Sequence, residues 1–156
     1  MSKELRTQIS KAKRIVVKIG SSSITTAQGG IDEKKIALIV EHISKHHKNN
    51  HEIVLVSSGA IAAGLAPLNL ESRPKDLSLQ QAVASVGQGL LVHRYSEAFS
   101  KFGINVGQVL LTAEDMSRRS HYRNAQRTFN KLLEMKKRET ETVKKARNTT
   151  KPKTFR

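Results

Sequence analysis

The chain of 156 residues contains no cysteine and no tryptophan, and aromatic residues make up only 4% of it. The absence of cysteine excludes a disulfide scaffold and any metal site built on thiolates. No apolar run approaches the ~20 residues that a membrane span requires. The N-terminus also lacks the apolar core of a signal peptide. We therefore expect a cytoplasmic protein that does not engage a membrane.

Acidic residues are also scarce. Asp and Glu number 13 against 28 Lys and Arg, which gives a formal net charge of +15. Nearly half of this excess lies in residues 136–156, a basic tail with almost no apolar side chains. Such a segment cannot bury enough apolar surface to offset its ordering entropy. We expect a helical extension to about Arg147 and disorder beyond it.

The rest of the sequence alternates between strand-like and helix-like segments. Runs of β-branched residues predict strands at 15–19, 53–56 and 104–111. Helical spacing of apolar residues predicts helices at 33–48, 59–65, 77–101 and 122–135. Expected helix-end signals are Asp32 as an N-cap, Gly64 as the end of the second helix and a capping box at Thr112-Ala-Glu-Asp115. This alternation favours an α/β fold with a mainly parallel, three-stranded sheet.

A lysine and several small residues stand where the first predicted strand ends, in the segment Lys18-Ile-Gly-Ser-Ser. An ammonium group, a glycine that lets backbone N–H groups approach, and two hydroxyls together suit phosphate oxygens. The segment is neither a Walker A loop nor a dinucleotide fingerprint. A surface lysine at the end of a strand explains the pattern about equally well.

A second run of small residues, Ser57-Ser-Gly-Ala-Ile-Ala-Ala-Gly64, follows the second predicted strand and begins a helix. The N–H groups at such a helix start attract a carboxylate or phosphate, and Ser58 adds a hydroxyl. The alternative is an ordinary N-cap serine followed by small residues that allow close helix packing. Because parallel strands end at the same edge of a sheet, we expect Lys18 and Ser58 to lie at one edge.

Two further clusters favour a solvated surface. Three histidines, His42, His46 and His47, have no carboxylate or later histidine at a familiar zinc spacing, so no metal site is expected. Four arginines, at positions 118, 119, 123 and 127, have only Tyr122 nearby as an aromatic residue that could stack on a base. We expect nucleic acid not to be a partner, except through non-specific contacts of the basic tail.

Taken together, five segments resemble the N-terminal half of the bacterial glutamate 5-kinases, a branch of the amino acid kinase superfamily. The matching stretches are VVKIGSS (16–22), IVLVSSGAIAAG (53–64), QQAVASVGQ (80–88), GINVGQVLLT (103–112) and RNAQRTFNKLL (123–133). The first stretch is widespread in the superfamily, whereas the second to fourth are specific to the glutamate kinase branch. The resemblance covers roughly residues 13–135, between an extension at 1–12 and the basic tail.

This resemblance implies a partial three-layer αβα sandwich. It implies ATP-dependent phosphorylation of the γ-carboxylate of L-glutamate, the first step of proline biosynthesis, with Mg²⁺ bound to ATP. Lys18 would be the catalytic residue and would contact the ATP phosphates. The other implied site residues are Gly20 and Ser21 in the phosphate loop, and Ser58, Gly59 and Ala60 around glutamate.

The sequence departs from the family after about residue 135. The family continues with an apolar strand, an Asn-Glu-Asn-Asp motif that holds substrate, a catalytic aspartate and a nucleotide-binding half. Here the basic tail follows instead, which we interpret as a frameshifted or prematurely ended reading frame with an incomplete, weakly active or inactive site. Two alternatives stay open: a basic nucleic-acid-binding protein that reuses half a kinase fold, and a related kinase for another carboxylate or carbamate. A homo-oligomer is also left open.

Overall fold

The computed structural model describes residue 7, residues 11–26 and residues 29–149 of the chain. It divides into two compact units, with the boundary between residues 106 and 107. The first unit carries both small-residue segments, 18–22 and 57–64. The second unit carries the arginine cluster.

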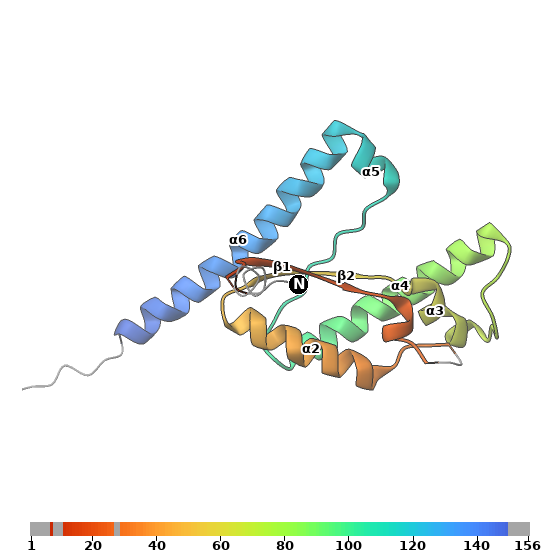
Figure 1. Ribbon diagram of the computed structural model, residues 1–156, viewed down its shortest axis with the longest axis horizontal. Helices are drawn as coiled ribbons and strands as arrows, with labels where there is room; N and C mark the ends of the chain where they lie inside the picture. The colour runs from red at the N-terminus through yellow and green to blue at the C-terminus, as the bar shows by residue number, and fades with distance from the viewer. Residues whose placement is uncertain (1–6, 8–10, 27–28, 150–156) are drawn as a thin grey trace, which may run out of the picture. The chain divides into compact units, whose positions relative to one another are not determined.

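The first unit is built on a two-stranded parallel sheet of β1 (Arg14–Ile19) and β2 (Glu52–Ser57). The two strands pair in register, with Lys18 opposite Val56 and Ile19 opposite Ser57. They are joined by η1 (Ser21–Ser23), a loop and α2 (Glu33–Lys48), and Figure 1 shows α2 running alongside the sheet. Both strands were predicted from their β-branched residues, and the structure confirms them.

One face of this sheet is covered by helices. The core joins apolar residues of α2 with residues of α4 (Leu77–Ser100), and side chains from both strands pack against it. The core members are Ile24, Ile36, Val40, Ile43, Leu91, Tyr95 and Phe99. Along β1 the side chains alternate between partly buried and exposed, as expected for a sheet with one covered face.

The N-cap predicted at Asp32 is confirmed, and an aspartate that was not predicted caps α4 in the same way. The Asp32 side chain accepts a hydrogen bond from the Lys35 N–H at 3.1 Å, and this fixes the first turn of α2. At α4 the Asp76 side chain accepts a hydrogen bond from the Leu79 N–H at 2.7 Å. A carboxylate at the N-cap also interacts favourably with the positive end of the helix dipole.

The end of α3 (Ala60–Leu65) differs from the prediction. Gly64 does not close the helix, because the chain continues directly into η2 (Ala66–Leu68). The residue that turns the chain is Asn69, whose φ of 53° lies in the left-handed region that usually follows a helix. Gly64 is instead buried inside α3, where its missing side chain allows close packing.

The predicted third strand is also wrong. Residues 104–111 form neither helix nor strand, so the sheet of the described chain has two strands rather than three. A strand exists only through hydrogen bonds to a neighbouring strand, whereas its apolar pattern depends on the sequence alone. Several side chains of this segment are exposed, including Leu110 at 69%.

The second unit contains α5 (Ala113–Ser117) and α6 (Arg119–Thr149). The predicted capping box is present, because the Asp115 N–H donates to the Thr112 hydroxyl and the Thr112 N–H donates to the Asp115 carboxylate. The helix α6 begins three residues before the prediction and extends to Thr149, so its C-terminal part confirms the expected helical extension. The helix ends two residues beyond the expected limit of about Arg147, and the disorder expected after it falls on residues 150–156, which lie outside the described chain.

Candidate active site

The parallel pairing of β1 and β2 brings the two small-residue segments to the same edge of the sheet. Ile19 and Ser57 are register partners at the last positions of the two strands. One residue further on, the Ser58 N–H donates a hydrogen bond to the Ile19 carbonyl oxygen at 3.2 Å. The prediction that Lys18 and Ser58 lie at one edge is therefore confirmed.

The two loops also touch beyond the strands. Gly59 has a φ of 120°, a conformation that side chains disfavour, and a Cβ built on it would lie 3.4 Å from both Cα and Cβ of Ser21. Gly59 thus allows the loop after β2 to turn while that loop stays close to the loop after β1. Two candidate residues from different segments, Ser21 and Gly59, are in this way direct neighbours.

Gly20 differs from Gly59. Its φ of −77° is ordinary, and a Cβ built on it would meet nothing within 4 Å. The chain's own packing therefore does not require a glycine here. The space beside Gly20 is open, which a loop that receives a ligand against its backbone would need.

Lys18 lies on the uncovered face of the sheet. Its side chain is exposed, and so are those of Val16 and of its register partner Val56, with exposed fractions of 63% and 46% for the two valines. An anion can therefore reach the Lys18 side chain, which stands on a strand whose backbone is held by hydrogen bonds to β2.

Ser58 is not the N-cap of α3. The N-cap position is taken by Gly59, and no side-chain hydrogen bond caps the helix. The Ser58 hydroxyl instead lies 3.4 Å from the Ile19 carbonyl oxygen, at the long limit of a hydrogen bond. The alternative explanation of Ser58 as an ordinary capping serine is therefore wrong. Its exposed hydroxyl and the first N–H groups of α3 are available to a ligand.

Ser57, in the same segment, makes a contact that sequence reasoning missed. Its hydroxyl lies 3.1 Å from the Tyr95 hydroxyl, which comes from α4. Burial raises the pKa of Tyr95 above its usual value of 10.0, and the hydrogen bond with Ser57 offsets part of that rise. The available signal was a tyrosine on the apolar face of the predicted helix at 77–101, where its hydroxyl requires a polar partner.

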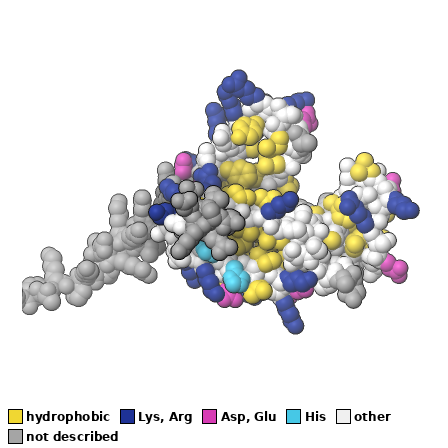
Figure 2. Space-filling model, in the orientation of Figure 1, with side chains coloured by type: hydrophobic (Ala, Val, Ile, Leu, Met, Phe, Trp, Pro, Cys, Tyr) yellow, Lys and Arg dark blue, Asp and Glu magenta, His cyan; other side chains and the backbone are white. Residues whose placement is uncertain are grey.

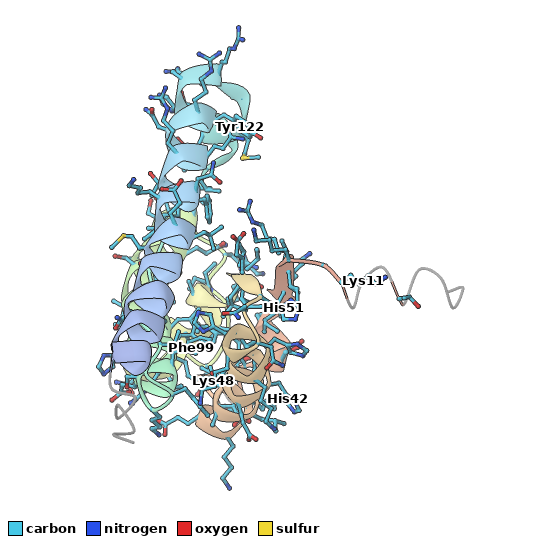
Figure 3. The ribbon with its side chains drawn as sticks, turned by 90° about the vertical axis from the view of Figure 1, so that its left-hand side faces the viewer. Lys11, His42, Lys48, His51, Phe99 and Tyr122 are labelled. Atoms are coloured by element: carbon cyan, nitrogen blue, oxygen red, sulfur yellow. The ribbon has the colours of Figure 1, made fainter. Side chains whose placement is uncertain are left out.

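The histidine and arginine clusters do not form a candidate site like the one at the ends of β1 and β2. The described residues contain no group of three or more His, Asp or Glu placed to hold a metal ion. His42, His46 and His47 all lie on α2; the His46 ring packs edge-on against the His51 ring, with centroids 5.8 Å apart, and Figure 3 shows His42 away from His51. In the second unit, Arg side chains gather around α5 and the start of α6 (Figure 2), where Arg118 pairs with Glu114.

No helix within the described ranges is long and apolar enough to cross a membrane. The cytoplasmic location expected from the sequence stays a prediction.

Comparison with known proteins gives a consistent result. The model of the amino acid kinase family matches residues 13–139. The glutamate 5-kinase of Streptomyces coelicolor is 60% identical over 130 residues, which are 83% of this chain and 35% of that protein. Those of Salinispora arenicola and Thermobifida fusca are 57% and 52% identical over 132 residues. The chain spans about a third of the length of these curated relatives.

Proposed function

The chain belongs to the amino acid kinase family, and on this premise we propose that its first unit is the glutamate-binding part of a glutamate 5-kinase. The proposed reaction transfers the γ-phosphoryl group of ATP to the γ-carboxylate of L-glutamate, with ADP as the leaving group. It would be the first step of proline biosynthesis. The observation that carries the proposal is that Ser21 and Gly59 are neighbours, because this brings the loop that suits phosphate beside the loop that suits a carboxylate.

The chemistry fits a site of this kind. The γ-carboxylate is already a nucleophile, so the protein needs to align the reactants and neutralise charge rather than remove a proton. In our proposal Lys18 stabilises the negative charge on the transferred phosphoryl group, while Gly20 and Ser21 shape the loop beside it. Glutamate is held by Ser58, Gly59 and Ala60, through the Ser58 hydroxyl and the backbone N–H groups at the start of α3.

Magnesium enters this proposal as part of the co-substrate Mg·ATP. The described residues offer no cluster of carboxylates and histidines for a resident metal ion. In phosphoryl-transfer sites, phosphate oxygens and water supply most of the ligands of Mg²⁺. The ion would neutralise charge on the phosphates, and Lys18 would add a second positive charge from the protein.

Binding of L-glutamate to the 156-residue chain tests the proposal, with isothermal titration calorimetry as the measurement. We expect weak, saturable binding that Ser58→Ala reduces about threefold to tenfold, the net effect of one ordinary hydrogen bond at a solvent-exposed position. Ser72→Ala is the matched control, because Ser72 is an exposed loop serine outside the site. If glutamate does not bind, or if the two variants behave alike, the assignment of this loop is wrong.

Turnover is a separate measurement. The chain spans about a third of its relatives' length, so most positions of a whole glutamate 5-kinase have no counterpart within its 156 residues. We expect little or no glutamate-dependent ATP hydrolysis from these residues alone, since lost positioning removes several kcal/mol of barrier reduction. Turnover at an ordinary kinase rate of ~1–100 per second, abolished by Lys18→Ala, would contradict this expectation.

A further inference from the structure

Tyr95 links the core of the first unit to the proposed glutamate loop. The tyrosine is 5% exposed, belongs to the hydrophobic core and stacks on Phe99 with ring centroids 6.4 Å apart. Its hydroxyl reaches out of that core to the Ser57 hydroxyl at 3.1 Å. Phenylalanine would fill the same apolar space, so the hydroxyl is the part of Tyr95 that packing does not explain.

A short chain of hydrogen bonds runs from this hydroxyl toward the loop. The Ser57 hydroxyl also lies 3.4 Å from the Ser58 carbonyl oxygen. If Tyr95 donates to Ser57, then Ser57 is free to donate to that carbonyl, and both protons are used. On the other side of the loop, the Ser58 N–H donates to the Ile19 carbonyl oxygen at 3.2 Å. The peptide groups that precede Gly59 are therefore held from two directions, by β1 and by α4.

We infer that Tyr95 is a positioning residue for the glutamate loop, acting through Ser57. The inference rests on the proposed function, because it assigns Tyr95 to the placement of Ser58, Gly59 and Ala60. Tyr95 does not touch the ligand itself. It fixes the direction of the Ser58 peptide groups, and with them the N–H groups that would face the glutamate carboxylate.

The alternative is that Ser57 merely satisfies a buried phenol. A buried hydroxyl without a partner costs about 1–3 kcal/mol, so the pair has a structural benefit in any case. The two explanations predict different effects of Tyr95→Phe, which removes both the hydroxyl and its need for a partner. A purely structural pair would leave the loop and its ligand affinity unchanged. A positioning pair would leave the loop less well fixed while the fold persists.

The experiment compares four variants of the 156-residue chain by ¹⁵N amide spectra and by titration with L-glutamate. Tyr95→Phe and Ser57→Ala remove the two hydroxyls, and Ser57→Thr retains the hydroxyl at position 57. Tyr122→Phe is the matched control, since the chain has only two tyrosines and Tyr122 is 45% exposed in the second unit. A double variant, Tyr95→Phe with Ser57→Ala, is added to measure the coupling between the two.

We expect Tyr95→Phe to shift the amide signals of Ser58, Gly59 and Ala60, to speed their hydrogen exchange and to weaken glutamate binding about threefold to tenfold. Ser57→Ala should act alike, the double variant should be no worse than either single variant, and Ser57→Thr should bind as the parent does. Tyr122→Phe should change none of these readouts.

Unchanged loop amides and unchanged affinity in Tyr95→Phe would overturn the inference. The same holds if Ser57→Ala disturbs the loop while Tyr95→Phe does not, because Ser57 would then act without Tyr95. If the parent chain fails to bind glutamate, the proposed function falls, and the exchange rates of the three loop amides alone decide whether Tyr95 positions them.

Discussion

Gly64 and Gly87 lie against each other where α3 and α4 cross. A Cβ built on Gly87 would be 2.5 Å from the Gly64 backbone nitrogen and would overlap the Ala60 carbonyl oxygen. A Cβ built on Gly64 would overlap the Val83 carbonyl oxygen. The backbone of α3, which begins at the candidate residue Ala60, is thus set directly on the backbone of α4.

Substitution of Gly87 should therefore be costly, despite the general benefit of alanine in a helix. We expect Gly87→Ala to lower the free energy of unfolding by about 1–3 kcal/mol or more. The added methyl group would overlap backbone atoms of α3, so the whole helix would have to shift to make room for it. Gly89→Ala is the matched control in the same helix, since its Cβ would meet nothing within 4 Å. It should stabilise the chain by up to ~1 kcal/mol. Urea unfolding followed by circular dichroism makes the comparison, and equal effects would contradict the crossing geometry.

Ser44 should be replaceable with a gain in stability. Its hydroxyl is buried at 0% exposure on α2 and has no hydrogen-bond partner within the described part of the chain. Because an unsatisfied buried hydroxyl costs about 1–3 kcal/mol, Ser44→Ala should raise the free energy of unfolding by about 1 kcal/mol. Ser85→Ala, at an exposed position of α4, should change it little. A loss of stability in Ser44→Ala would indicate a partner, such as bound water.

The titration of Tyr95 reports on its contact with Ser57. Burial raises the pKa of Tyr95 above 10.0, and the Ser57 hydrogen bond acts in the opposite direction. Ser57→Ala should therefore raise the pKa further. Absorbance at ~295 nm follows phenolate formation, and it reports on only two tyrosines because the chain has no tryptophan. Tyr122 serves as the internal reference, and a lowered Tyr95 pKa in the variant would contradict the contact.

The same shift predicts how stability depends on alkaline pH. The unfolded chain loses the Tyr95 proton near pH 10, before the folded chain does. The folded state then holds more protons, so the stability that depends on the neutral phenol is complete below pH 10 and falls as the pH rises toward the folded-state pKa. Tyr95→Phe should flatten this part of the stability profile.

The sequence alone predicted the elements whose signals are local. Asp32 caps α2 and Thr112 forms a capping box with Asp115, because these bonds span only three residues. The edge shared by Lys18 and Ser58 followed from strand order alone. These features require no knowledge of which distant residues meet.

The features that were missed depend on distant contacts. Residues 104–111 have the apolar pattern of a strand, yet a strand also needs a partner, and no local pattern supplies one. Gly64 was predicted to end a helix because glycine is common at helix ends. It instead allows α3 to pack closely on α4 at Gly87, a contact between residues far apart in the sequence. The bond between Ser57 and Tyr95 joins residues 38 positions apart.

The basic surface of the second unit tests the alternative of a nucleic-acid-binding protein. Three exposed arginines, Arg119, Arg123 and Arg127, are spaced four residues apart along α6 and therefore share one helix face. We expect weak binding of single-stranded RNA that declines steeply between about 50 and 200 mM salt, as counterion release requires. Because the basic tail should carry most of this binding, deletion of residues 136–156 should abolish it, whereas replacement of the three arginines by glutamine should reduce the salt dependence only slightly and leave glutamate binding intact. Tight binding that persists at high salt would favour the alternative over the kinase assignment.

Lys18 should contribute to the binding of Mg·ATP through its charge. Two unit charges 4 Å apart in water attract by about 1 kcal/mol, and by about 4 kcal/mol near a protein surface. Because Lys18 is exposed, we expect the lower end of this range, so that Lys18→Ala weakens binding about fivefold to tenfold.

Lys34→Ala, which removes an exposed lysine from α2, is the control for net charge. Calorimetry at two salt concentrations should show a smaller effect of Lys18→Ala at high salt. Equal losses in the two variants would mean that Lys18 acts only through the general charge of the chain, and its place in the phosphate loop would then be wrong.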